Sequence, residues 1–186
     1  MRASPRVLIL YASIDGQTAR IAERMAGVIE RAGYTVTLRR AEEMEALWEI
    51  DTHEAVIVGG GIRYGKHAEA LVERVKATRE ALEARPNAFF SVSLSAGGPG
   101  AKPAEAARHL DDFRTRTGWE PQECASFAGA LQYSRYNFFL RLMMRFIVGH
   151  AGGDTDMSRD YEYTDWDAVD RFAGRLFGRL AHAAAA

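Results

Sequence analysis

The chain has 186 residues, which fits a single domain, and 47% of them are hydrophobic, enough for one sizeable core. Its formal net charge of −1 excludes a global field that would favour nucleic acid, so we expect no nucleic-acid partner. The single cysteine, Cys124, cannot form an internal disulfide and fits a reducing compartment. No segment approaches the ~20 apolar residues that span a bilayer, and we expect a cytoplasmic protein.

Short apolar runs alternate with longer helical patterns along the chain, which is typical of a parallel sheet covered on both faces. The expected strands are Val7–Tyr11, Thr35–Arg39, Ala55–Gly59, Asn87–Leu94 and Ser126–Leu131. The expected helices are Thr18–Ala32, Ala41–Leu47, Ala68–Ala84, Pro103–Thr117 and Trp166–Leu180. This order predicts an α/β fold with a doubly wound five-stranded parallel sheet. One domain would cover 1–182, with an insertion at about 131–160 after or within the fifth strand and a short tail at 183–186.

Three polar, glycine-containing loops follow the first, third and fourth expected strands. They are Ala12–Thr18, Gly60–His67 and Ser95–Lys102. Doubly wound sheets bind ligands beyond the carboxyl ends of their strands, so we expect these loops to meet at one site.

The loop after the first strand has the residue types of a phosphate-binding turn. Gly16 lets the backbone approach a ligand closely, Ser13 and Thr18 offer hydroxyls, and the following helix offers unpaired N–H groups. Asp15 would repel a phosphate, so we expect its side chain to turn outward. A plain helix cap with an Asp-Gly turn explains the same residues equally well.

The run Ser13–Thr18 resembles the FMN phosphate loop of flavodoxins, with Asp15, Gly16 and Gln17 at its centre. More narrowly, the chain resembles the menaquinone-dependent protoporphyrinogen IX dehydrogenases, a flavodoxin-superfamily group of bacterial haem biosynthesis. The matching stretches are collinear and run through nearly the whole chain: Ser13–Thr18, Gly61–Gly65, Ala128–Tyr136, Gly152–Asp156 and Tyr163–Trp166. This resemblance implies a flavodoxin-like fold and FMN as the cofactor.

With the resemblance, two further loops are expected to border the flavin ring. The residues of the first are Gly61, Ile62, Arg63, Tyr64 and Gly65, and those of the second are Ser95, Ala96 and Gly97. In the first, Tyr64 would stack on the ring and Arg63 would face the reduced flavin or a substrate carboxylate; a tight turn with two solvated side chains is the alternative. The second loop has no aromatic residue, which leaves one flavin face open unless another aromatic such as Tyr133 covers it.

A basic and strongly apolar segment, Tyr136–Gly149, lies within the expected insertion. Its cationic residues are Arg141 and Arg145, and Arg135 precedes it. Such a helix needs the domain core, a partner subunit or a lipid surface to cover it, and a basic amphipathic helix fits the lipid surface. A core helix with two snorkelling arginines is the alternative. Arg135, Tyr136, Arg141 and Arg145 are therefore candidates for contact with substrate or membrane, because guanidinium groups pair well with the propionates of a porphyrinogen.

The resemblance implies an oxidoreductase that oxidises protoporphyrinogen IX to protoporphyrin IX through FMN. It also implies a membrane quinone as acceptor, menaquinone or ubiquinone, and peripheral association with the inner face of the cell membrane. Three alternatives stay open: a flavodoxin-type electron carrier, an NAD(P)H:quinone reductase, and a membrane-surface interaction module without flavin. The scattered histidines predict no metal site. No residue stands out as a general base, and the oligomeric state is left open.

Overall fold

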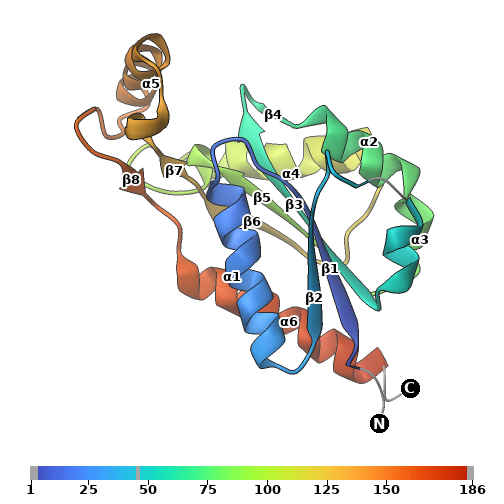
Figure 1. Ribbon diagram of the computed structural model, residues 1–186. Helices are drawn as coiled ribbons and strands as arrows, with labels where there is room; N and C mark the ends of the chain where they lie inside the picture. Colours follow the sequence, from blue (N-terminus) through green and yellow to red (C-terminus); the bar gives the residue numbers. More distant parts are fainter. Residues whose placement is uncertain (1–3, 45–46, 184–186) are drawn as a thin grey trace.

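Five parallel strands form the centre of the molecule, in the order β2-β1-β3-β5-β6, as the computed structural model shows (Figure 1). The structure describes residues 4–44 and 47–183. The strands are β1 (Arg6–Ala12), β2 (Thr35–Arg40), β3 (Ala55–Arg63), β4 (Lys66–His67), β5 (Asn87–Ser93), β6 (Cys124–Ala128), β7 (Ala130–Leu131) and β8 (Tyr161–Glu162). The helices are α1 (Gln17–Arg31), α2 (Glu69–Ala77), α3 (Arg79–Glu83), α4 (Pro103–Thr117), α5 (Phe138–His150) and α6 (Trp166–Ala183). Three short 3-10 helices cover Leu47–Thr52, Leu94–Ala96 and Tyr133–Arg135.

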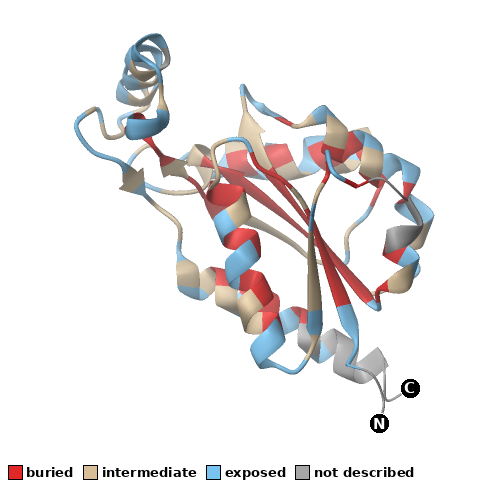
Figure 2. Cartoon of the chain, viewed as in Figure 1, coloured by how far each residue is buried: buried red, intermediate tan, exposed pale blue. Residues whose placement is uncertain are grey.

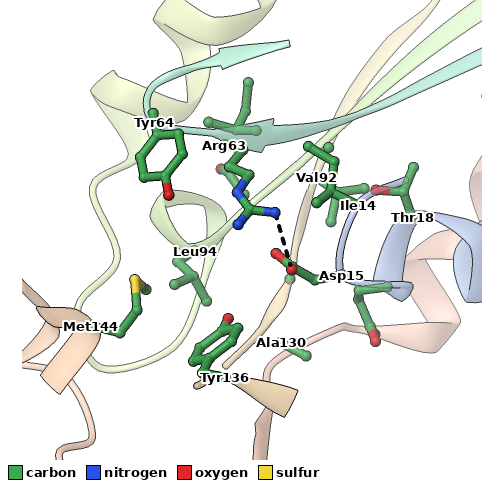
Figure 3. A pocket seen from close by; sticks show the side chains of 15 residues that line it. Ile14, Asp15, Thr18, Arg63, Tyr64, Val92, Leu94, Ala130, Tyr136 and Met144 are labelled. Atoms are coloured by element: carbon green, nitrogen blue, oxygen red, sulfur yellow. Dashed lines mark ion pairs between the residues drawn. The ribbon is translucent and has the colours of Figure 1, made fainter. Parts of the chain in front are cut away.

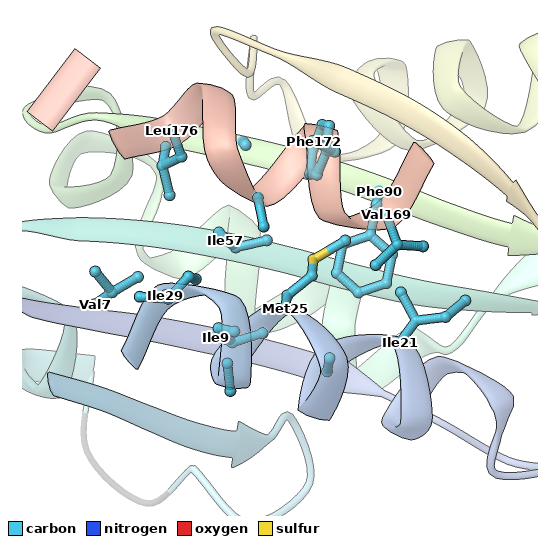
Figure 4. Close-up of a cluster of buried hydrophobic side chains, with 14 of the residues drawn as sticks. Val7, Ile9, Ile21, Met25, Ile29, Ile57, Phe90, Val169, Phe172 and Leu176 are labelled. Carbon is cyan, nitrogen blue, oxygen red and sulfur yellow. The ribbon is translucent and has the colours of Figure 1, made fainter. Parts of the chain in front are cut away.

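Helices α1 and α6 cover one face of the sheet (Figure 4). Val7 and Ile9 alternate along β1 so that both side chains point to this face. They meet Met25 of α1 in one buried cluster, which Phe172 and Leu176 of α6 complete. Burial of each such side chain is worth ~1.5–3 kcal/mol, so the strand–helix alternation in the sequence is also the main source of stability.

Helices α2 and α4 cover the opposite face, which receives the other side chains of β1. Leu8 and Leu10 belong to this second cluster. Within it, the ring of Phe89 on β5 stacks on that of Phe113 on α4, with 4.1 Å between the centroids. The sheet is thus a buried middle layer between two helical layers, which confirms the predicted doubly wound architecture (Figure 2).

Two expected helices differ from the structure. The segment Ala41–Leu47 is not a helix: residues 41–43 form a turn and a 3-10 helix begins at Leu47, while residues 45 and 46 lie outside the described residues. The expected helix Ala68–Ala84 is two helices, α2 and α3, which meet at Thr78. The Thr78 hydroxyl donates a hydrogen bond to the Arg74 carbonyl at 2.8 Å, a local bond that competes with regular helix geometry.

The third and fifth strands also differ from their expected bounds. β3 does not end at Gly59 but continues to Arg63. Its glycines leave space for side chains of the neighbouring strands, since a Cβ on Gly59 would lie 2.1 Å from the Phe90 ring. β6 begins at Cys124 and ends at Ala128; the chain then leaves the main sheet, and β7 pairs antiparallel with β8. The insertion therefore follows the fifth strand. Residues 184–186 of the expected tail lie outside the described residues.

Helix α5 stands away from the three-layer body, joined to it through β7 and β8 (Figure 1). Most of its surface is exposed (Figure 2). Phe139 and Phe146 are 82% and 77% exposed, which is unusual for aromatic side chains of this size. Among the described residues, no helix is long and apolar enough to cross a membrane.

Candidate functional site

The turn between β1 and α1 is built around a glycine in the left-handed region. Gly16 has φ +95° and occupies the N-cap of α1, where it offers no side chain to the first-turn N–H groups. The buried Ser13 hydroxyl accepts a hydrogen bond from the Ala19 N–H at 3.2 Å. An α-helix leaves its first N–H groups without partners in the helix, so this turn can accept an anion.

The segment after β3 is a β-hairpin and not the open loop expected over Gly60–His67. β4 pairs with the end of β3, with Arg63 opposite Lys66. The two residues of the turn, Tyr64 and Gly65, have φ +50° and +75°, the pair of positive values that a type I′ turn requires. Tyr64 is held in a conformation uncommon for a residue with a side chain, and its ring is 76% exposed at the tip.

A cleft lies between the α1 turn and this hairpin, at the carboxyl ends of β1, β3 and β5 (Figure 3). It is lined by Ile14, Asp15, Gln17, Thr18, Gly61, Ile62, Arg63, Tyr64, Val92, Ser93, Leu94, Gly129, Ala130, Tyr136 and Met144. A Cβ on Gly61 would lie 2.7 Å from the Thr18 hydroxyl oxygen, so the backbone of β3 passes directly beside the turn. The sheet topology thus brings the first two predicted loops together.

Asp15 does not turn outward as expected. Its carboxylate points across the cleft to the guanidinium of Arg63, with 3.8 Å between Oδ1 and Nη1 (Figure 3). The attraction between this carboxylate and the guanidinium on the hairpin is the physical reason.

Residues of the insertion close the cleft on its outer side. Arg135 reaches the α1 turn and donates a hydrogen bond from Nη1 to the Asp15 carbonyl at 2.9 Å. Tyr136 lines the cleft, and burial raises the pKa of its phenol, with Asp15 contributing, so it keeps its proton at neutral pH. Arg141 is half-buried and bonds the Tyr136 carbonyl at 3.5 Å, whereas Arg145 is exposed.

A second pocket adjoins the cleft beneath α5. The two share Ile62, Tyr64, Ser93, Leu94 and Met144. The second pocket is further lined by Gly65, Ser95, Gly97, Gly100, Lys102, Glu105, His109, Leu131, Met143, Ile147, Val148, Ala151, Gly153 and Tyr163. Ser95 and Gly97 therefore line this pocket and not the cleft, while Ala96 lines neither.

Comparison with known proteins identifies the family. The family described as "Flavodoxin domain" matches residues 8–158. The chain belongs to the flavodoxin family. Two curated relatives are named protoporphyrinogen IX dehydrogenase [quinone]. The one from Escherichia coli is 35% identical, over 92% of this chain and 94% of that protein. The one from Leishmania major is 37% identical, over 91% of this chain and 74% of that protein.

These relatives confirm the resemblance predicted from the sequence, and by their name they are oxidoreductases. The solved structure of oxidised flavodoxin 1 from Bacillus cereus has the same fold, with a TM-score of 0.53 at 12% identity over 93% of this chain and 97% of that one. Membership of the flavodoxin family supports a flavin cofactor.

The residues of the cleft fit a flavin of this family. The glycine turn of α1 can accept a phosphate, and the apolar side chains of Ile62, Leu94 and Ala130 suit a flat ring. The Tyr136 phenol and the Arg63 guanidinium line the same cleft and could donate hydrogen bonds to such a ring. Gln17 lines the same cleft but is engaged: its amide donates to Thr164 Oγ1 at 2.8 Å and Glu162 Oε1 at 3.1 Å.

The family motifs near the C-terminus hold the insertion in place. Tyr163 donates a hydrogen bond to the Asp154 carboxylate at 2.5 Å, and Tyr133 donates to the Asp154 carbonyl at 3.0 Å. Tyr133 is fully buried and does not line the cleft; Tyr136 is the aromatic residue that reaches the cleft from this segment. The Gly98 backbone lies so near Tyr163 that a Cβ there would come within 2.8 Å of the ring.

Several lining residues were not expected from the sequence: Val92, Ser93, Leu94, Gly129, Ala130 and Met144. Most lie at the carboxyl ends of β5 and β6, where a doubly wound sheet binds its ligands, so the strand order indicates their position. Their residue types do not, because small and apolar residues are also common away from binding sites. Over the described ranges, 4–44 and 47–183, no group of three or more His, Cys, Asp or Glu residues could hold a metal ion.

Proposed function

We propose that this protein binds FMN in the cleft and oxidises protoporphyrinogen IX to protoporphyrin IX, with a membrane quinone as the electron acceptor. The observation that carries the proposal is the meeting of the Gly16 turn with the Ile62–Tyr64 hairpin, in a chain 35–37% identical to protoporphyrinogen IX dehydrogenases. When bound, FMN would supply the redox chemistry: three hydrides and three protons leave the substrate in succession, and the two electrons of each hydride pass to the acceptor before the next transfer. The step belongs to haem biosynthesis.

The predicted residues of the α1 turn, the hairpin and the start of the insertion have the following parts in this proposal. Ser13, Gly16 and Thr18 would hold the phosphate, aided by the helix dipole of α1. Gly61 would allow close approach of the ribityl chain, and Ile62 and Tyr136 would bound the ring. Asp15 and Arg135 keep the turn in shape through the Arg63 ion pair and the 2.9 Å hydrogen bond. Gln17 ties the turn to β8.

The open side of the cleft would receive the porphyrinogen. Arg63 lines the cleft, Arg135 bonds its turn and Arg145 is exposed on α5, and the guanidinium groups of these three residues suit propionate groups. We assign no side chain as the acceptor of the proton that the substrate loses with each hydride.

Helix α5 would bring the protein to the inner face of the cell membrane. Phe138, Phe139, Leu142 and Phe146 are all exposed on α5, and no acidic residue interrupts the helix. A short basic helix with exposed aromatics suits the lipid interface. On this proposal the protein is cytoplasmic and peripheral, and a membrane-dissolved quinone, menaquinone or ubiquinone, is within reach.

Anaerobic mixing of the FMN-loaded protein with protoporphyrinogen IX tests the function. We expect the flavin absorbance to bleach and to return when menadione is added. Absence of bleaching, in protein shown to hold FMN, would contradict the proposal. Bleaching by NADPH alone would then indicate a quinone reductase, and reduction only by protein partners would indicate an electron carrier. Protein that never takes up FMN would indicate an interaction module.

A further inference from the structure

Helix α5 has two apolar sides with different surroundings. Phe138, Phe139, Leu142 and Phe146 form the outer side, and all four are exposed. Met143, Met144, Ile147, Val148 and the following Ala151 form the inner side, and all five line the second pocket. With 3.6 residues per turn, these two sets lie on opposite sides of the helix. Contact of the outer side with lipid therefore does not account for the apolar residues of the inner side, which face the second pocket.

The inner side of α5 closes a pocket that suits a small apolar ring. The pocket encloses about 280 Å³, near the lower end of the ~300–1,000 Å³ usual for small-molecule sites. Leu94, Leu131 and Ile147 give it aliphatic walls, and Met143 and Met144 add flexible thioethers that adapt to a ring. This room fits a two-ring headgroup.

The pocket also has hydrogen-bond donors at its α4 end. Lys102 and the buried His109 line it there, and Glu105 lies between them. The Ser95 hydroxyl donates to Glu105 Oε1 at 3.0 Å, Lys102 Nζ is 4.0 Å from Oε2, and His109 Nε2 is 3.9 Å from Oε1. Lysine and imidazole N–H groups can donate to a carbonyl oxygen. Because Glu105 offsets the charge of Lys102, the end suits a neutral carbonyl better than two propionates.

We propose that this second pocket binds the ring of the electron-accepting quinone, with its carbonyl toward Lys102 and His109. The inference rests on the proposed function and adds where the acceptor binds. The pocket shares Ile62, Tyr64 and Leu94 with the cleft, so a ring here lies beside the cofactor site. Its other boundary is α5 itself, and on the helix Met143 of the inner side lies next to Phe139 and Phe146 of the outer side, so an isoprenoid tail that leaves the pocket past Met143 does not pass Arg141 or Arg145.

Adjacent residues of α5 provide a matched test. Ile147 lines the pocket and its neighbour Phe146 does not, although both are exposed apolar residues. The probe is menadione, a naphthoquinone without a tail, and its binding to FMN-loaded oxidised protein is measured by equilibrium dialysis without lipid. We expect Ile147→Glu to raise the menadione Kd at least ~10-fold, because a carboxylate is costly in an apolar site, and Phe146→Glu to leave it within about twofold.

A second pair guards against misfolding of one variant. Met143→Glu should repeat the loss and Leu142→Glu should not, with helicity and FMN content measured for all four proteins. No menadione binding by the unaltered protein, or equal effects within each pair, would overturn the proposal. So would an Ile147→Glu variant that binds menadione normally but is reduced slowly by protoporphyrinogen IX, since the pocket would then belong to the porphyrinogen.

The two proposals fail separately. If protoporphyrinogen IX does not bleach the flavin of the unaltered protein, the proposed function fails, whereas the menadione Kd values still report on the pocket. If bleaching occurs and the paired variants do not differ, only the location of the quinone is wrong.

Discussion

His67, the last residue of β4 in the hairpin, has a buried side chain, and its titration should be visible in the stability of the protein. Its Nε2 lies 3.0 Å from the Ser91 hydroxyl, and its ring centroid is 4.9 Å from that of Phe113. Burial, with smaller contributions from His109 and Arg116, lowers its pKa from 6.5 to about 3. The folded state therefore resists the proton that the unfolded state accepts.

The direction of the pH effect follows from this difference. Between about pH 6.5 and pH 3 the unfolded chain binds more protons than the folded protein. The contribution of His67 to the free energy of unfolding is therefore fully present above pH 6.5 and is lost as the pH is lowered toward 3. With about 1.4 kcal/mol per pKa unit, the loss from His67 is about 2 kcal/mol between pH 7 and pH 5 and approaches ~4–5 kcal/mol near pH 3.

Urea unfolding of the flavin-free protein at pH 7 and pH 5 measures this loss. The difference between the unaltered protein and His67→Gln isolates one residue, because the other titrating groups are common to both. We expect the unaltered protein to lose about 2 kcal/mol more than His67→Gln. His150→Gln, at the exposed end of α5, is the control and should behave as the unaltered protein. Equal losses in all three proteins would refute the reasoning.

Three further predictions concern the sheet, the turn and the insertion. Gly59→Ala places a Cβ 2.1 Å from the Phe90 ring and should lower the free energy of unfolding by ~1–3 kcal/mol in urea. Gly16→Ala, at φ +95°, should weaken FMN binding about tenfold by fluorescence titration, whereas Gly33→Ala, at φ +93° with open space around it, should not. Thr164→Val removes a 2.7 Å hydrogen bond to the Ala128 carbonyl and should destabilise by ~1–3 kcal/mol, measured by thermal unfolding.

The sheet and most helices were predictable because their signals are local. The helix Pro103–Thr117 was predicted to the residue, since Pro103 stands in its first turn and Gly118 ends it at φ +67°. The break at Thr78 was not, because the same apolar spacing continues on both sides and only a side chain–backbone bond separates the two helices. The hairpin was missed for another reason. Consecutive glycines are typical of a loop, but here they lie in β3, where the absence of a Cβ lets the rings of Phe90 and His67 pack against the strand.

The location of the cleft was predictable from topology, but the pairings between its residues were not. Parallel strands place the loops after β1 and β3 at one edge, whichever side chains they carry. The ion pair of Asp15 with Arg63 joins residues far apart in the chain, and no sequence pattern predicts such a pair. Likewise, the 3-10 turn at Tyr133–Arg135 decides that Tyr133 is buried and Tyr136 faces the cleft. The sequence alone does not indicate which of these two tyrosines lines the cleft.

The arginines of α5 illustrate how the structure sharpens a test. From the sequence, Arg141 and Arg145 are equivalent cations one turn apart. In the fold, Arg141 is half-buried and bonds the Tyr136 carbonyl, so its replacement would disturb the cleft as well as any lipid contact. Arg145 is exposed, and Arg145→Glu changes charge alone. We expect it to reduce co-sedimentation with anionic vesicles while FMN affinity is unchanged. Unchanged co-sedimentation would remove Arg145 from the membrane contact and leave the outer apolar side of α5 to carry it.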